Sequence, residues 1–314
     1  MENATQVTEF VFKAFASFSG LPYVNSALFC VFLFLYSLLF SGNVLIMFII
    51  SANHRLHTPM YFFLSKLSFI DLCYSSVTVP KFLVDSLSGR KVISFNSCIA
   101  QLFFFHFFGC AENFIFTVMA YDRFVAICKP LQYSRIMNRQ CCLLLMAATW
   151  AMCIIHSTIQ KGLTSELTFC GPNEIHSYFC DTPPLIKLAC TDITMINIIT
   201  VANSGIVSFC CFLTLVISYI GIVRSVLKIK TIEGRRKAFS TCVSHLTAVL
   251  LFFGPCVFIY MRPSTELQVD QVVRVFYTFI APTINPVIYT LRNEEIKTSV
   301  KNLLSRKPDS WFIL

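Results

Sequence analysis

Two side chains of opposite charge stand next to each other at the end of a long apolar run. Asp122 and Arg123 close the run that begins near Ile99. Each costs about 2.5 to 3.5 kcal/mol at the centre of a bilayer, whereas both can reach the interface from the end of a spanning helix. On physical grounds alone, the pair indicates a charged end that anchors a spanning helix at the membrane surface.

Two further carboxyl groups lie inside apolar stretches. Asp71 and Glu112 are ionisable groups at positions where packed side chains or lipid are expected around them. An ionisable group inside a membrane helix is commonly functional, although a satisfied structural hydrogen bond explains it nearly as often. Together with Asn43 and Asn285, the two carboxyl groups are expected to form one intramembrane polar cluster.

An imidazole and a thiol lie four residues apart, at His106 and Cys110, so they share one face of a helix, and Gly109 leaves a notch beside them. These two ligand types suit a soft ion such as Cu(I), and a sulfur-containing small molecule could complete the coordination. Asn203 is a poor third ligand, so copper is the weaker of two hypotheses. The favoured hypothesis makes His106 a hydrogen-bond partner for an alcohol, ketone or ester.

Motifs of common catalytic sites are absent from the sequence. It contains no G-x-S-x-G, no H-E-x-x-H and no Walker loop, and its six histidines are dispersed. The sequence therefore predicts a protein that is not an enzyme. A transporter is a better alternative, because Lys66, Asp71 and Glu112 could form an ion path. Against a transporter, the sequence shows no internal repeat and no pair of broken helices in corresponding halves.

The elements that carry these residues are long apolar stretches. Of the 314 residues, 56% are hydrophobic and 13% are charged, whereas a soluble domain carries roughly 25% charge. Long unbroken runs joined by short polar links predict membrane-spanning helices and exclude the alternating strands of a barrel. The sequence therefore predicts an all-α membrane protein, a bundle of seven transmembrane helices. The predicted spans are 23–50, 58–86, 96–128, 139–161, 194–227, 238–261 and 271–291.

The distribution of Lys and Arg predicts the orientation of the bundle. Most of the 25 Lys and Arg residues, among them Arg55, Lys129 and Arg235, lie in one alternating set of links. This set is expected on the cytoplasmic side, so the net charge of +9 indicates a lipid bilayer as partner and no nucleic acid. The predicted regions are an extracellular N-terminus at 1–22, a seven-helix domain at 23–291 and a cytoplasmic tail at 292–314. Within the tail, 293–304 is expected to form a short amphipathic helix on the membrane surface.

Cysteine placement and a glycosylation sequon agree with this orientation. Four of the 15 cysteines fall in the predicted outer region, the side that is oxidising enough to keep disulfides. Four cysteines allow three pairings, and their spacing does not choose among them. Asn3 begins an N-glycosylation sequon and is expected to carry a glycan. The four outer cysteines are Cys98, Cys170, Cys180 and Cys190.

Long phrases along almost the whole chain resemble one known family. They are MAYDRFVAICKPLQY at 119–133, LHTPMYFFLS at 56–65, KAFSTCVSHL at 237–246 and PTINPVIY at 282–289. These phrases resemble those of olfactory receptors of the tetrapod-type class (class II), a branch of the rhodopsin-like G-protein-coupled receptors. Phe124 departs from the family, which more often has Tyr there, but the loss of one hydroxyl leaves the Asp-Arg pair intact.

The resemblance implies how the cytoplasmic face would signal. In that family the arginine is held by its neighbouring acid at rest and meets the G protein when active, while a kinked sixth helix swings outward. His245 is expected to hydrogen-bond toward Arg123 at rest. The implied activation and G-protein-coupling residues are Asp122, Arg123, Tyr219, His245, Asn285, Pro286 and Tyr289.

The resemblance also bears on the polar cluster and on the cysteines. In related receptors, a cluster such as that of Asn43, Asp71 and Glu112 holds a sodium ion or water and rearranges on activation. The sequence leaves open whether a sodium ion binds at Asp71 and Glu112 or whether the cluster is only a hydrogen-bonded network. The implied disulfides are Cys98–Cys180 and Cys170–Cys190.

A ligand site in the outer half of the bundle is implied as well, for a small volatile odorant. A stimulatory G protein, cyclic AMP and the plasma membrane of olfactory cilia would be the signalling context. A receptor for amines would be expected to have a carboxylate in the outer half of helix three. Residues 101–106 contain none, which favours neutral ligands. A receptor for a non-odorant ligand is the alternative within the same fold. The predicted ligand-binding residues are Phe105, His106, Gly109, Cys110, Asn203, Phe253, Val257, Tyr260 and Thr278.

Overall fold

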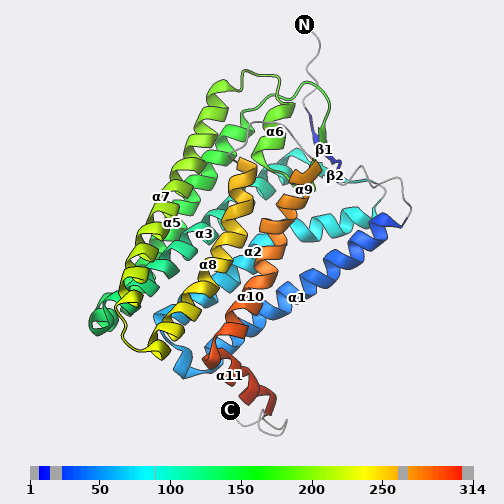
Figure 1. Cartoon of the computed structure of the whole chain (residues 1–314). Coiled ribbons are helices and arrows are strands. Elements are labelled where there is room, and N and C mark those ends of the chain that lie inside the picture. Colours follow the sequence, from blue (N-terminus) through cyan, green and yellow to red (C-terminus); the bar gives the residue numbers. More distant parts are fainter. Residues whose placement is uncertain (1–6, 15–22, 89, 261–267, 306–314) are drawn as a thin grey trace.

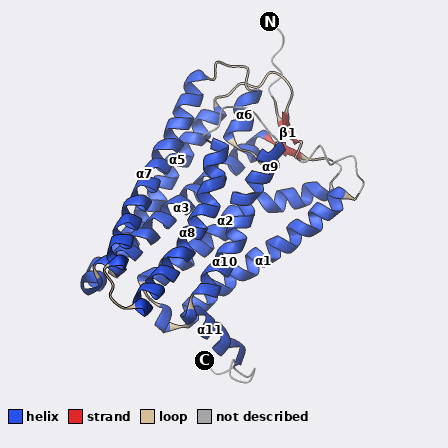
Figure 2. Cartoon of the chain, in the orientation of Figure 1, coloured by secondary structure: helices blue, strands red, loops and turns tan. Residues whose placement is uncertain are grey.

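The computed structural model describes residues 7–14, 23–88, 90–260 and 268–305. Within them, seven helices are long and apolar enough to cross a membrane. They form one bundle (Figure 1), and helix dominates the chain (Figure 2), so the predicted seven-helix membrane fold is confirmed. The spans are α1 (Val24–Ala52), α2 (Pro59–Leu87), α3 (Phe95–Cys128), α5 (Arg139–Ser165), α7 (Thr194–Leu227), α8 (Ile232–Tyr260) and a composite of α9 (Gln268–Val275), the π-helical η4 (Phe276–Ile280) and α10 (Ala281–Arg292).

The helix boundaries differ from the predicted ones mainly at α5 and α8. α5 continues to Ser165, past the predicted end at 161, and α8 begins at Ile232, before the predicted start at 238. The first turns of α8 contain a charged run at 233–237. Charged residues end an apolar run, but Glu, Lys and Arg are good helix formers, so a helix can continue beyond its apolar part.

Prolines interrupt the backbone hydrogen bonding of three spans. Pro80 lies inside α2, Pro255 inside α8 and Pro286 inside α10. Each proline removes one backbone hydrogen bond and favours a kink at its position. The π-helical turn of η4 is a second kind of interruption, and it carries Thr278. Of the helices with predicted activation residues, α8 with His245 and α10 with Asn285 and Tyr289 therefore carry such interruptions.

The central helix of the bundle is α3, which contacts α2, α5, α7 and α8. Its buried side chains extend along its whole length, from Cys98 to Val125. On the outside of the bundle, large apolar side chains are exposed, for example Phe209 on α7 at 65%. Exposed apolar side chains on long helices suit contact with lipid. Because α3 is central, it positions side chains in both candidate sites.

The predicted tail helix is present as α11 (Glu294–Ser305), and it is docked against the bundle. Ile296 is fully buried. Asn53, after the end of α1, donates from Nδ2 to Ser299 Oγ at 2.9 Å. Tyr61 on α2 donates its hydroxyl hydrogen to Glu295 Oε2 at 2.7 Å. The tail helix is therefore fixed to the end of α1 and the start of α2 at the α11 end of the bundle (Figure 1).

A small sheet, which the sequence did not predict, covers the other end of the bundle (Figure 1). Its central strand is β1 (Glu9–Phe12), which pairs antiparallel with β2 (Val92–Ser94) and parallel with β3 (Glu174–Ile175). Phe10 and Phe12 are buried, and they pack with the side chains of the neighbouring strands. The first strand of the chain thus ties the start of α3 to the segment that follows α5.

Candidate functional site

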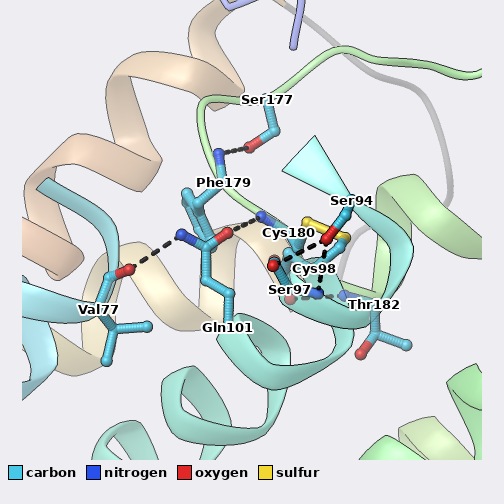
Figure 3. The surroundings of a disulfide bond; sticks show 10 residues. Val77, Ser94, Ser97, Cys98, Gln101, Ser177, Phe179, Cys180 and Thr182 are labelled. Carbon is cyan, nitrogen blue, oxygen red and sulfur yellow. Dashed lines mark hydrogen bonds between the residues drawn. A yellow bond between two sulfur atoms is a disulfide. The ribbon is translucent and has the colours of Figure 1, made fainter. Parts of the chain in front are cut away.

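Two disulfides fix the long connection between α5 and α7. Cys98, near the start of α3, is bonded to Cys180 with a Cα–Cα distance of 5.5 Å. Cys170 is bonded to Cys190 with a Cα–Cα distance of 5.9 Å. The structure therefore contains both disulfides that the family resemblance implies. At the start of α3, Ser94 accepts the Ser97 backbone N–H at 3.3 Å, which caps the helix and fixes where Cys98 lies (Figure 3).

One buried glutamine joins this connection to two helices. Gln101 lies one turn after Cys98 on α3, and its Oε1 accepts the backbone N–H of Cys180 at 2.9 Å (Figure 3). Its Nε2 donates to the carbonyl of Val77 on α2 at 2.9 Å. Val77 lies in the turn before Pro80, where a proline disturbs the helical hydrogen bonds. Gln101 therefore fixes the backbone beside the disulfide to both α2 and α3.

The segment Tyr178–Thr182 fills the outer interior of the bundle. The hydroxyl of Tyr178 is hydrogen-bonded to that of Thr278 in η4. The Phe179 ring lies 4.6 Å from the Phe105 ring, centroid to centroid. Thr182 Oγ1 lies 3.0 Å from His106 Nε2. All five residues of the segment are at most 1% exposed, so they form a wall of any site that uses Phe105, His106 or Thr278.

Most of the predicted ligand-binding residues face this region. Phe105, His106, Cys110, Phe253 and Thr278 are buried. Gly109 faces the ring of Tyr74, whose nearest atom is 3.4 Å from the position of an added Cβ. Asn203 Nδ2 donates to the carbonyl of His156 at 3.3 Å, which ties α7 to α5. The side chain of Tyr260 lies outside the described residues.

Val257 was predicted to line the ligand site, but its side chain is 49% exposed and does not face the interior. Residues four apart share a face of a regular helix, which would place Val257 with Phe253. The core-facing positions of α8 are Val249, Phe252, Cys256 and Ile259, and Phe253 lies at the edge of this face, so the residue four positions after it falls outside the face. Cys256, which the sequence did not nominate, packs against the core instead.

The connection between α5 and α7 supplies residues that sequence reasoning missed. Tyr178, Phe179, Asp181 and Thr182 were not nominated, although they are buried against the nominated helix residues. One signal was available in the sequence, because two aromatic residues directly precede a cysteine of the outer region. A disulfide to the start of α3 draws such residues toward the bundle.

The donor set around His106 and Cys110 does not fit a copper site. His106 Nε2 is hydrogen-bonded to Thr182 Oγ1, and the Cys110 thiol lies against the Cys153 thiol of α5. Among the described residues, no group of three His, Cys, Asp or Glu side chains could hold a metal ion. The structure therefore supplies no reason to route ligand binding through copper.

The predicted polar cluster is assembled in the middle of the bundle. Asn285 Nδ2 donates to Asp71 Oδ2 at 3.0 Å, and the carboxyl of Glu112 lies beside that of Asp71. Asn43 donates to the carbonyl of Pro282 at 3.3 Å, one helical turn from Asn285. The four cluster residues are at most 1% exposed. Five of their oxygens accept no hydrogen bond, namely Asp71 Oδ1, both oxygens of Glu112, Asn43 Oδ1 and Asn285 Oδ1.

The pair formed by Asp122 and Arg123 differs from its expected geometry. Asp122 does not form an ion pair with Arg123, although both are described and buried; its Oδ1 accepts the Tyr133 hydroxyl at 2.8 Å. Adjacent residues of a helix do not face each other, which explains why the pair is open. Burial, followed by the charge of Asp122, raises the pKa of Tyr133, so that hydroxyl remains a donor. Arg123 keeps two nitrogens, Nε and Nη1, without a hydrogen-bond partner.

His245 also differs from the expectation that it bonds toward Arg123. Its Nε2 lies 3.0 Å from the backbone carbonyl of Phe116 on α3. Its Nδ1 lies 2.7 Å from the hydroxyl of Tyr219 on α7. A carbonyl only accepts, so Nε2 carries the hydrogen and Nδ1 accepts from Tyr219. His245 therefore joins α8 to both α3 and α7, and it leaves Arg123 to other partners.

A small cavity lies beside Arg123 at the α11 end of the bundle. It has a volume of about 30 Å³. The hydroxyl of Tyr289 is buried and has no hydrogen-bond partner. On the other side of α3, the ring of Phe124 occupies the notch at Gly221 of α7, where an added Cβ would overlap it. The lining residues are Met60, Leu64, Met119, Arg123, Ser244, Tyr289 and Asn293.

Seven spanning helices, with two disulfides at one end of the bundle and a buried arginine at the other, define a seven-helix membrane protein. A family model described as olfactory receptor matches residues 30–307. Olfactory receptor 4E2 of Mus musculus is 55% identical over 97% of this chain and 98% of its own length. Olfactory receptor 4E1 of Homo sapiens is 56% identical over 90% and 89%, and human olfactory receptor 4S2 is 51% identical over 98% and 97%. The chain belongs to the olfactory receptor family, which consists of rhodopsin-like G-protein-coupled receptors that are not enzymes.

Proposed function

We propose that this receptor binds small, neutral, volatile molecules in the outer half of the bundle and activates a stimulatory G protein that raises cyclic AMP. The observation that carries the proposal is Arg123. It is a cation only 5% exposed, with two nitrogens lacking a hydrogen-bond partner, beside a cavity at the cytoplasmic end. A buried donor without a partner costs about 1 to 3 kcal/mol, so a partner that supplies acceptors there would be stabilised.

Activation follows as a shift between two packings of α8. Outward movement of α8 would break the bond between His245 and Phe116. The bond between His245 and Tyr219 would have to break or move with it. Each hydrogen bond contributes about 0.5 to 1.5 kcal/mol net. An odorant that binds the open packing more tightly by this amount shifts the population toward it.

The proposed orientation places the N-terminus outside the cell and α11 in the cytoplasm. Both disulfides lie in the connection between α5 and α7 or at the start of α3, at the end of the bundle that β1 covers. Disulfides persist on the oxidising side of a membrane, which supports this orientation. The proposed location is the plasma membrane of olfactory cilia. The sequon at Asn3 lies outside the described residues, and its glycosylation remains part of the proposal.

A cyclic AMP assay separates this function from transport. Cells that express the receptor and a stimulatory G protein are expected to raise cyclic AMP in response to members of a broad odorant panel. The response should disappear when the G protein is omitted. A transporter would instead move a labelled solute with or without the G protein. A receptor at the cell surface that stays silent across the panel would contradict the proposal.

The polar cluster fits a sodium ion, and we extend the proposal to it. Hard cations bind oxygen ligands, and five buried oxygens of Asn43, Asp71, Glu112 and Asn285 lack donors. Asp71 and Glu112 would hold the ion, which would supply the positive charge that two adjacent carboxyl groups need. Because Asn285 bonds Asp71 across to α10, an occupied cluster would stabilise the resting packing.

Replacement of external sodium by choline is therefore expected to increase odorant potency in the wild type, because sodium would favour the resting state. The increase should be absent in Asp71→Asn. Ser41→Ala is a suitable control, since Ser41 bonds only carbonyls of its own helix and is exposed. Concentration–response curves for cyclic AMP in both media would test this. Equal wild-type curves would leave the cluster as a hydrogen-bonded network.

A further inference from the structure

One face of α3 holds the segment Tyr178–Thr182 at successive turns. Cys98 bonds Cys180 covalently, and Gln101 accepts the Cys180 N–H (Figure 3). Phe105 packs on Phe179. These three α3 positions are spaced by three and four residues, which places them on one face. The segment is therefore fixed on α3, and its polar side chains meet those of the bundle in a defined arrangement.

The hydrogen on His106 can be placed from its surroundings. Asp181 Oδ1 lies 3.7 Å from His106 Nε2 and accepts the backbone N–H of Thr182 at 2.8 Å. A carboxylate oxygen at that distance favours the tautomer with hydrogen on Nε2, because a ring lone pair would be repelled. Nε2 then donates to Thr182 Oγ1 at 3.0 Å. The hydroxyl hydrogen of Thr182 is left over for another acceptor.

The neighbouring hydroxyls have no hydrogen to spare. Thr278 donates its own hydroxyl hydrogen to the carbonyl of Arg274 at 2.7 Å. The hydrogen between Thr278 and Tyr178 must then come from Tyr178. Both hydroxyl hydrogens are therefore used inside the protein. Among the hydroxyl pairs that join the segment to the helices, Thr182 holds the hydrogen that remains available.

Aromatic rings pack together on α3 next to His106, the partner of this donor. Phe105 lies 4.6 Å from Phe179 and 5.2 Å from Tyr74, centroid to centroid. Because His106, the partner of Thr182, directly follows Phe105 on α3, a ligand whose polar atom reaches the Thr182 hydroxyl can place its carbon skeleton against these rings. In the packing described, Thr182 is 1% exposed, so the ligand needs a shift of the segment. Cys180 stays bonded to Cys98, so the shift involves Thr182 and the rest of α6 (Thr182–Leu188) and unfolds no span.

We propose that the Thr182 hydroxyl, oriented by His106 and Asp181, is the specificity-determining donor of the odorant site and that it selects molecules with a carbonyl oxygen. Ketones, aldehydes and esters carry such an acceptor on an apolar skeleton. His106 acts through Thr182 as a positioning residue and does not touch the odorant. This inference rests on the proposed function, because it assigns the ligand class of the same site.

The test compares Thr182→Val, which removes the hydroxyl at nearly constant shape, with Thr182→Ser, which keeps it. The probes are linear eight-carbon ketones, aldehydes, esters, alcohols and hydrocarbons, read out by cyclic AMP with surface expression measured for each variant. Wild-type agonists are expected to carry a carbonyl. Thr182→Val should weaken their potency roughly three- to tenfold, the value of one hydrogen bond, and Thr182→Ser should preserve it.

A double variant distinguishes positioning from a structural role. If His106 acts through Thr182, adding His106→Ala to Thr182→Val should weaken carbonyl agonists no further than Thr182→Val alone. Additive losses would overturn the proposed relay. A comparison on the wild type needs no variant: equal potency of a ketone and the hydrocarbon of the same skeleton would also overturn the inference. If alcohols were the agonists and no carbonyl compound were, the inference about Thr182 would be contradicted but the proposed function would stand. If a surface-expressed receptor responded to none of the probes, the proposed function would be contradicted as well.

Discussion

Arg123→Ala is expected to abolish odorant-dependent cyclic AMP production while the receptor still reaches the cell surface. The guanidinium offers five donors in a fixed plane, and alanine offers none. Arg123 is buried near the C-terminal end of α3, and its Nε and Nη1 have no hydrogen-bond partner in the protein. The substitution removes those donors. It leaves Asp122 with its partner Tyr133, because Asp122 forms no ion pair with Arg123.

The measurement is a cyclic AMP concentration–response curve together with surface labelling of intact cells. Arg139→Ala serves as a matched control, because Arg139 is an exposed arginine at the start of α5. The control should signal like the wild type. Normal signalling by a correctly localised Arg123→Ala receptor would show that the arginine does not couple to the G protein.

The second large effect concerns the disulfide between α3 and the α5–α7 connection. Cys98→Ser and Cys180→Ser are expected to reduce surface expression and odorant response equally, because either change breaks the same bond. Loss of a native disulfide typically costs about 2 to 5 kcal/mol. The loss also leaves Gln101 alone to hold the Cys180 backbone, so Phe179 and Thr182 would leave their positions on α3.

The double variant gives the sharper result. Cys98→Ser combined with Cys180→Ser should be no worse than either single change, since partners in one bond are not additive. Cys30→Ser, which replaces an exposed free cysteine, is the matched control and should have little effect. Losses that add in the double variant would mean that the two cysteines act independently.

The spans could be predicted from the sequence because the physics that selects them is local. In lipid a helix satisfies its own backbone, so the length of an apolar run is enough to locate it. The polar cluster was also accessible, since Asp71 and Glu112 are conspicuous in apolar runs and have few ways to be satisfied there. Asn285 does bond Asp71 in the structure, across two helices.

The side-chain partners could not be predicted, because they depend on helix rotation and on distant segments. The face of α8 that meets the core is set by how the helix is rotated in the bundle, and Val257 lies outside that face although Phe253 is buried. The partners of His245 come from α3 and α7, and no sequence spacing identifies a backbone carbonyl such as that of Phe116 as its acceptor. Thr182 reaches His106 only because a disulfide brings it there, which requires the tertiary fold.

The placement of β1 at the centre of its sheet has a consequence for the order of synthesis. Glu9–Phe12 leaves the ribosome before every span, yet one neighbour, Glu174–Ile175, is made only after α1, α2, α3 and α5. β1 must therefore wait for β3 while most of the bundle is inserted, although its other neighbour, β2, is made directly after α2. The sheet that covers this end of the bundle can therefore be completed only after α5 has been made.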